Sequence, residues 1–153
     1  MIEVIFEDDR WAALGLEDLC GPAGVAAMAV TGRETTGFEI ALMGCDDARI
    51  ATLNQDFRGK PTPTNVLSWP ASETPPMQGG VPEIELGDIA IAYETCQREA
   101  TEKGVSVQDH VTHLVIHGIL HLLGYDHISD EEAEEMETLE IKALAKLGIG
   151  NPY

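Results

Sequence analysis

The amino-acid sequence predicts an α+β (mixed α/β) fold in which a small mixed sheet packs against helices. Three observations predict this class. Short apolar runs with strand character occur at the start and in the middle of the chain. Helix-period segments with capping residues separate and follow them. Strands and helices do not alternate strictly, as they would in a fully parallel sheet. The 153 residues are expected to form one domain, residues 1–153.

The N-terminal quarter is expected to contain a strand, a broken helical segment and a second strand. Residues 2–6 (Ile-Glu-Val-Ile-Phe) alternate weakly, as a strand does. Residues 11–31 are helical in pattern, but Gly21-Pro22 is expected to break them into two short helices, because proline removes a backbone donor. Residues 38–43 (Phe-Glu-Ile-Ala-Leu-Met) are mostly apolar and are predicted to form the second strand.

The next segment is expected to hold a capped helix, a short strand and a long loop. Asp46 or Asp47 is placed to cap a helix that ends near Gly59. Residues 66–69 form a short apolar strand that a proline closes. Residues 70–83 contain four prolines and two glycines and are therefore predicted to be a loop.

The C-terminal half is predicted to be mostly helical. Residues 86–92 are expected to form a strand, and a helix follows over residues 93–103. A capping-box variant at residues 106–109 opens the next helix. That helix is apolar on nearly every side, which predicts burial at the centre of the fold. Ser129 is expected to cap a final amphipathic helix that ends at Gly148.

The charge of the chain limits how it can meet a nucleic acid. With 27 acidic and 9 basic residues the net charge is −18, so most of the surface repels a phosphate backbone. The acidic run over residues 130–137 is interpreted as the solvated face of a helix. The one close basic pair is Arg58-Gly59-Lys60, and a nucleic-acid contact would have to use a local basic spot of this kind.

The sequence predicts a cytoplasmic protein with no contact with a membrane. No apolar run reaches the roughly 18 residues that span a bilayer, and the first ten residues lack the features of a signal peptide. Cys20, Cys45 and Cys96 show no Cys-x-x-Cys spacing, so they are expected to be reduced, buried thiols.

All five histidines lie between residues 110 and 127. His117 and His121 are four residues apart, so on a helix they share one face and can bind one tetrahedral ion. Gly124 is expected to end the helix and to let the chain return His127 to the same ion. Three nitrogen ligands leave a coordination position for water, which is the arrangement of a catalytic site. One Zn²⁺ ion is favoured, although Ni²⁺ or Co²⁺ would suit the same ligands.

This spacing equals that of the His-x-x-x-His-x-x-Gly-x-x-His metallopeptidases, with one difference. Gly118 occupies the position of their general-base glutamate, so a proton must pass to water, to the substrate or to another side chain. His113, one turn before His117, is a candidate catalytic proton donor or a group that holds a ligand, with packing or capping as the alternative. Asp126 is a candidate for orienting the ring of a metal ligand.

The stretch His-Gly-Ile-Leu-His-Leu-Leu-Gly-Tyr-Asp-His at residues 117–127 resembles the YbeY family of bacterial endoribonucleases. Residues 53–60 (Leu-Asn-Gln-Asp-Phe-Arg-Gly-Lys) and 64–70 (Thr-Asn-Val-Leu-Ser-Trp-Pro) resemble the family's central signature, and residues 86–91 (Leu-Gly-Asp-Ile-Ala-Ile) its next strand.

Two positions depart from the family pattern. Asn65 stands where the family usually has aspartate, and Trp69 where it usually has phenylalanine. The tryptophan keeps an apolar aromatic ring, whereas the asparagine removes a carboxylate, so no role is carried to Asn65.

The resemblance implies a zinc-dependent, single-strand-specific endoribonuclease in which metal-activated water attacks a phosphodiester. It implies ribosomal RNA as the substrate, a role in its maturation and in ribosome quality control, and a ribosomal or ribosome-associated protein as partner. It places Arg58 near the scissile phosphate, and a guanidinium suits bidentate phosphate contact. Lys60 is the second candidate for substrate binding, although this basic pair would also stabilise a helix end. Two alternatives stay open, a metallopeptidase-like hydrolase and a non-enzymatic ribosome-assembly factor with a structural metal.

Overall fold

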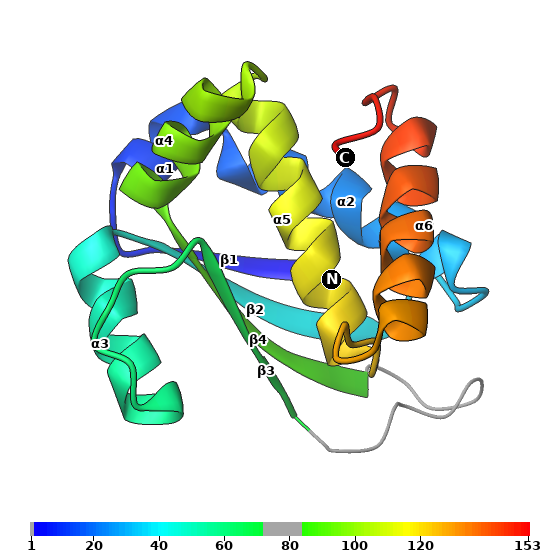
Figure 1. The fold of residues 1–153 in the computed structure, drawn as a ribbon, viewed down its shortest axis with the longest axis horizontal. Coiled ribbons are helices and arrows are strands. Elements are labelled where there is room, and N and C mark those ends of the chain that lie inside the picture. Colours follow the sequence, from blue (N-terminus) through cyan, green and yellow to red (C-terminus); the bar gives the residue numbers. More distant parts are fainter. Residues whose placement is uncertain (1, 72–83) are drawn as a thin grey trace.

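The computed structural model describes residues 2–71 and 84–153, which are organised around one four-stranded sheet (Figure 1). The strands are β1 (Ile2–Phe6), β2 (Phe38–Cys45), β3 (Val66–Pro70) and β4 (Ile84–Ala92). Their order is β1-β2-β4-β3. The β1–β2 and β2–β4 pairs are parallel, and the β3–β4 pair is antiparallel. The sheet is therefore mixed, and the predicted α+β class is confirmed.

Six helices surround the described sheet. They are α1 (Arg10–Leu14), α2 (Leu16–Val30), α3 (Asp47–Arg58), α4 (Tyr93–Lys103), α5 (Val107–Leu122) and α6 (Asp130–Lys146). In Figure 1, α2, α5 and α6 lie on one side of the sheet and α3 lies on the other. Helix α5 contacts α2, α4, α6, β3 and β4, and most of its side chains are buried. It is the central buried helix that the apolar pattern predicts.

Side-chain alternation on the strands divides the buried residues into two groups. The larger group fills the space between the sheet and α2, α5 and α6, and includes Ile40, Leu42 and Ile116. The smaller group, which includes Ile50 and Leu67, lies where α3 covers part of the opposite face. The burial pattern of β2 follows the pleat, since buried and partly exposed residues alternate from Phe38 onward.

The predicted break at Gly21-Pro22 is wrong. The helical segment is interrupted at Gly15, whose φ of +86° ends α1, and α2 then continues through Pro22. An internal proline costs about 3 kcal/mol in a helix, because it lacks a backbone donor and crowds the preceding turn. Cys20 and Ala23, on either side of Pro22, are both buried, so an unbroken helix keeps this face in the core.

The other element predictions are confirmed to within a few residues, and the caps are resolved. Asp46 rather than Asp47 caps α3, because its carboxylate accepts a hydrogen bond from the Arg49 N–H at 2.8 Å. Asp47 instead accepts from the N–H and the hydroxyl of Thr95, at 3.0 and 2.8 Å, which ties α3 to α4. Ser129 caps α6 as predicted. No described helix has the length and apolar character needed to cross a membrane. From residue 72 onward, the loop predicted at 70–83 lies outside the described residues.

Candidate metal centre

The end of α5 brings the three predicted ligands together. His117 and His121 lie on the last two turns of this helix, and the helix ends at Leu122. Gly124 follows with φ of +100°, and its N–H donates to the His121 carbonyl at 3.0 Å. Residues other than glycine rarely adopt this backbone conformation. Gly124 therefore permits the turn that returns His127 to the helix.

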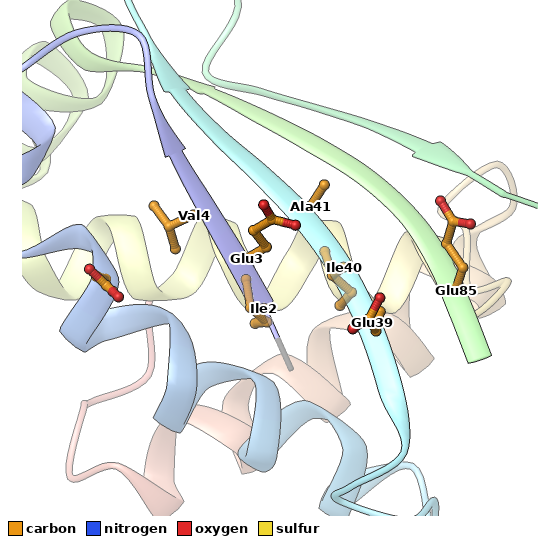
Figure 2. A pocket seen from close by; sticks show the side chains of 8 residues that line it. Ile2, Glu3, Val4, Glu39, Ile40, Ala41 and Glu85 are labelled. Atoms are coloured by element: carbon orange, nitrogen blue, oxygen red, sulfur yellow. The ribbon is translucent and has the colours of Figure 1, made fainter. Parts of the chain in front are cut away.

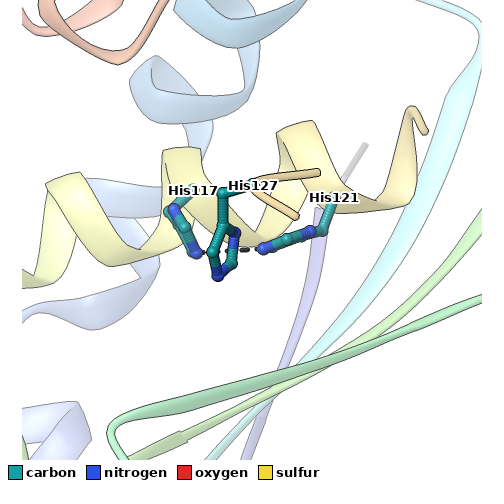
Figure 3. A group of neighbouring side chains, drawn as sticks. All are labelled: His117, His121 and His127. Atoms are coloured by element: carbon teal, nitrogen blue, oxygen red, sulfur yellow. Dashed lines mark hydrogen bonds between the residues drawn. The ribbon is translucent and has the colours of Figure 1, made fainter. Parts of the chain in front are cut away.

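The three imidazole rings converge (Figure 3). The Nε2 atoms of His117 and His121 are 3.0 Å apart, and one nitrogen from each of the three rings lies within 4.8 Å of the others. Zinc–nitrogen bonds of about 2.0–2.1 Å in a tetrahedral site place two ligand nitrogens roughly 3.3 Å apart. The donor set therefore fits one tetrahedral ion. Among residues 2–71 and 84–153, no fourth histidine, cysteine or carboxylate joins this group.

The neutral imidazole is the form that binds a metal, and the site favours it. Burial, together with the neighbouring His117 and His127, lowers the pKa of His121 to about 4. The His121 ring is therefore the neutral imidazole, with one nitrogen free to bind an ion, at neutral pH. His127 is the most exposed of the three, with 58% of its side chain accessible.

A carboxylate that the sequence did not reveal contacts His117 at Nδ1, the ring nitrogen that does not face His121. Oε2 of Glu140, on α6, lies 3.0 Å from His117 Nδ1, and Glu140 is only 1% exposed. Burial raises the pKa of Glu140, but hydrogen bonds from His113, His117 and Tyr153 outweigh it and lower the pKa to about 2. The ionised carboxylate can only accept, so the Nδ1 atom of His117 is the donor. Glu140 was missed because it belongs to an acidic helix, although it falls on the buried stripe of Met136, Ala143 and Leu144.

His113 does not reach the same position as the three converging rings. Its ring is buried, and Nε2 makes a short hydrogen bond with Oε1 of Glu140 and lies 3.3 Å from the Tyr153 hydroxyl. Tyr153 itself donates to Oε1 of Glu140 at 2.6 Å. His113 and Tyr153 thus meet Glu140, on the side of the carboxylate that His117 does not use.

A pocket of about 560 Å³ opens beside the three histidines. Its lining residues come from α3, the segment before β3, β3 itself, the end of α5 and the following turn: Arg58, Thr64, Asn65, Val66, Ser68, Pro70, His117, His121, Gly124, Tyr125, Asp126 and His127. Arg58, the last residue of α3, therefore lines the same pocket as the three histidines. Lys60 is exposed and is not among the described lining residues.

Asp126 lines this pocket, and its contact with His127 is through the backbone. Oδ1 of Asp126 accepts from the His127 N–H at 2.8 Å, whereas it lies 3.8 Å from Nδ1 of the ring. The second distance is too long for a hydrogen bond. Asp126 therefore fixes the turn that carries His127 more directly than it fixes the ring.

Asn65 also lines the pocket, but its side chain is held by neighbouring groups. Its Nδ2 donates to Glu99 Oε1 at 3.1 Å, and its Oδ1 accepts from the Val66 N–H at 2.7 Å. The same Glu99 oxygen lies 2.8 Å from His110 Nε2. An aspartate at position 65 would place a second carboxylate beside Glu99, whereas the amide of Asn65 donates a hydrogen bond to it.

Gly118 lies against the sheet and is buried. A Cβ added there would lie 3.1 Å from Ile89 Cδ1 and 3.5 Å from two further atoms of Ile89. A glutamate at this position would have to displace the strand residue. The close packing of α5 on β4 therefore leaves no room for a general-base glutamate at position 118.

A second hollow of about 350 Å³ has the opposite electrostatic character. Figure 2 shows Glu3, Glu39 and Glu85, from three adjacent strands, around it. Glu17 of α2 is a fourth carboxylate, and the described lining includes no basic residue. This hollow would repel a phosphate group, whereas the pocket at the histidines contains a guanidinium.

Comparison with known proteins gives consistent matches over nearly the whole chain. A family profile described as "Endoribonuclease YbeY" matches residues 24–148. The "Endoribonuclease YbeY" of Dinoroseobacter shibae is 51% identical, and the match covers 99% of this chain and 90% of that protein. The protein of the same name from Cereibacter sphaeroides is 51% identical, over 100% of this chain and 98% of its own. A solution structure from Thermotoga maritima has a TM-score of 0.61 and 25% identity, with 97% of this chain and 92% of that chain covered.

Proposed function

Since the chain belongs to the YbeY endoribonuclease family, we propose that it is a metal-dependent endoribonuclease whose centre is the pocket at the end of α5. The observation that carries this proposal is the convergence of His117, His121 and His127 in a pocket that also contains Arg58. We further propose that residues 1–153 act as one domain, in the cytoplasm, on single-stranded ribosomal RNA during its maturation and in ribosome quality control.

In this proposal the three imidazoles hold one Zn²⁺ ion, for which their neutral nitrogens are suitable donors. Such an ion supplies Lewis acidity, both toward a phosphoryl oxygen and toward water, whose pKa falls to about 7. Arg58 contacts the phosphate and offsets the charge that grows on it during cleavage. Lys60, outside the pocket, contacts a neighbouring phosphate of the RNA.

Proton transfer in this proposal does not need a residue at position 118. His127 is largely exposed, so the pocket is open to water that can carry the proton away. Asp126, 45% of whose side chain is exposed, is the one carboxylate among the described residues that line the pocket. His113 contacts the buried Glu140. Its two predicted roles were to donate a proton and to hold a metal ligand, and we propose the second.

The charge of −18 favours a narrow contact with RNA. Most of the surface repels the phosphate backbone, so affinity for RNA depends on Arg58, Lys60 and the bound cation. We therefore propose that a ribosomal or ribosome-associated protein delivers the RNA strand, because a partner supplies the binding energy that this acidic surface does not.

Three variants test the assignment. His121→Ala is expected to lose both the metal, measured by elemental analysis of the purified protein, and cleavage of single-stranded ribosomal RNA fragments. Arg58→Ala is expected to keep the metal and to lose about 100-fold or more in cleavage rate, the scale of losing one charge-stabilising donor. Arg98→Ala is the control, since this exposed arginine lies on α4 and does not line the pocket. Unchanged metal content in His121→Ala would refute the site.

The same preparations separate the alternatives. Cleavage of casein without cleavage of RNA would identify a peptidase instead. Loss of the fold on titration with a chelator, with no RNA cleavage by the metal-loaded protein, would identify an assembly factor with a structural ion. The proposed metal-dependent endoribonuclease is expected to cleave RNA only when it is loaded with metal and to keep its fold when the ion is removed.

A further inference from the structure

A hydrogen-bond network centred on the buried carboxylate of Glu140 lies on the side of His117 that faces away from the pocket. It consists of Glu140, His113 and Tyr153, none of which is among the described residues lining the pocket. The two oxygens of Glu140 have different neighbours. Oε1 meets His113 Nε2 and the Tyr153 hydroxyl, and Oε2 meets His117 Nδ1 at 3.0 Å.

The partners of Glu140 decide which nitrogen of His117 is free. A neutral imidazole carries its proton on one nitrogen and a lone pair on the other. The carboxylate accepts from Nδ1–H, which leaves the lone pair on Nε2. That atom is the one 3.0 Å from Nε2 of His121, within the converging group.

We propose that Glu140 is a positioning residue of the metal centre, which fixes His117 in the tautomer whose Nε2 can bind the ion. The inference rests on the proposed function only in taking the three histidines as metal ligands. A carboxylate behind a ligating histidine holds the ring in place and makes its other nitrogen a better donor. Glu140 belongs to α6 and His117 to α5, so the orientation of the His117 ring also depends on how these two helices pack.

His113 and Tyr153 fix the orientation of the carboxylate. Both are donors to Oε1, since Tyr153 donates its hydroxyl proton and His113 donates from Nε2. In agreement, Nδ1 of His113 is buried without a hydrogen-bond partner in the part of the chain described. Two donors on one oxygen leave the other oxygen facing His117. His113 therefore acts on the metal centre through Glu140, whose carboxylate it orients.

This arrangement makes a distinct prediction for Glu140→Gln. The amide oxygen of the glutamine is expected to face the two donors, so that its NH₂ group faces His117 Nδ1. His117 must then accept at Nδ1 and carry its proton on Nε2, where it blocks the ion. Metal affinity is expected to fall by about 10- to 100-fold, the scale measured when such carboxylates are removed. Tyr153→Phe removes one of the two donors and is expected to cause a smaller loss.

The control is Glu135→Gln, which makes the same change of charge at an exposed position of α6. Zinc affinity is measured by competition with a coloured chelator. The tautomer of His117 is read in the metal-free protein from the nitrogen chemical shifts of ¹⁵N-labelled histidine. A purely structural role for Glu140 would lower thermal stability but would not exchange the protonated nitrogen of His117.

The inference is overturned if folded Glu140→Gln keeps both the wild-type zinc affinity and the Nδ1–H tautomer. It is also overturned if Glu135→Gln loses as much affinity as Glu140→Gln. Failure of the proposed function is a separate result, because wild-type protein that binds zinc but cleaves no RNA leaves the effect of Glu140 on zinc affinity intact. If Glu140→Gln does not fold, Tyr153→Phe decides by the same two measurements.

Discussion

The contact between α5 and β4 at Gly118 gives a prediction whose size follows from the structure. In Gly118→Ala, the new Cβ lies 3.1 Å from Ile89 Cδ1, and Ile89 is 1% exposed and has little room to move. Overpacking of this kind costs about 1–3 kcal/mol. Replacing glycine by alanine inside a helix returns about 1 kcal/mol. The free energy of unfolding is therefore expected to fall by about 0–2 kcal/mol.

The same change is expected to become stabilising when Ile89 is shortened. Ile89→Val removes Cδ1, and the nearest remaining atoms of that side chain are 3.5 Å from the new Cβ, an ordinary contact. In the Ile89→Val background, Gly118→Ala then contributes its helix preference of about 1 kcal/mol without the overpacking. The coupling energy between the two substitutions is expected to be about 1–3 kcal/mol.

Urea unfolding followed by circular dichroism measures all four proteins of this cycle. Ile50→Val is the control partner, because this buried isoleucine lies in the smaller core under α3. Gly118→Ala and Ile50→Val should be additive within about 0.5 kcal/mol. Zinc affinity should stay at the wild-type value, because the new methyl group faces the sheet. Full additivity of Gly118→Ala with Ile89→Val would refute the close approach of helix and strand.

Three further predictions concern the sheet, a thiol and the pocket. Gly87→Ala should destabilise the protein by about 3 kcal/mol or more in urea unfolding, because φ is +143° and a Cβ would lie 2.1 Å from the Trp69 carbonyl oxygen. Burial raises the pKa of Cys45 to about 12, so at pH 8 it should be alkylated at least about 100-fold more slowly in native protein than in urea, as followed by mass spectrometry. Asn65→Asp should lose about 1 kcal/mol of unfolding free energy, because it replaces a donor 3.1 Å from a Glu99 oxygen by a carboxylate, and Glu99→Gln should restore it.

Local patterns were enough to predict most of the elements. Caps such as Ser106 and Ser129 act within one turn of backbone, so the sequence shows them directly. The break expected at Gly21-Pro22 failed because burial of one face of α2, a tertiary effect, outweighs the local cost of Pro22. The order of the strands was not predicted, because pairing between distant segments leaves no local signal.

In the candidate site, too, the features set by local sequence were predicted and those set by tertiary packing were not. His117, His121 and Gly124 are neighbours in sequence, so helix geometry alone predicted how the rings meet. Arg58 was placed at the pocket only by the resemblance to a known family. Glu140 lies 23 residues beyond His117, and its contact depends on how α6 packs against α5. One signal was available, since a charged residue on the apolar stripe of a helix requires a buried partner.

The three candidate ligands differ in how firmly the fold holds them. His117 and His121 are fixed on a buried helix, whereas His127 follows a turn and is largely exposed. A cation would therefore be captured in two stages, first by the helix and then by closure of the turn. Its departure would begin with His127, which is the most exposed of the three and lies outside the helix. Substitutions within residues 124–126 would then change the exchange of the ion without altering any of its three ligands.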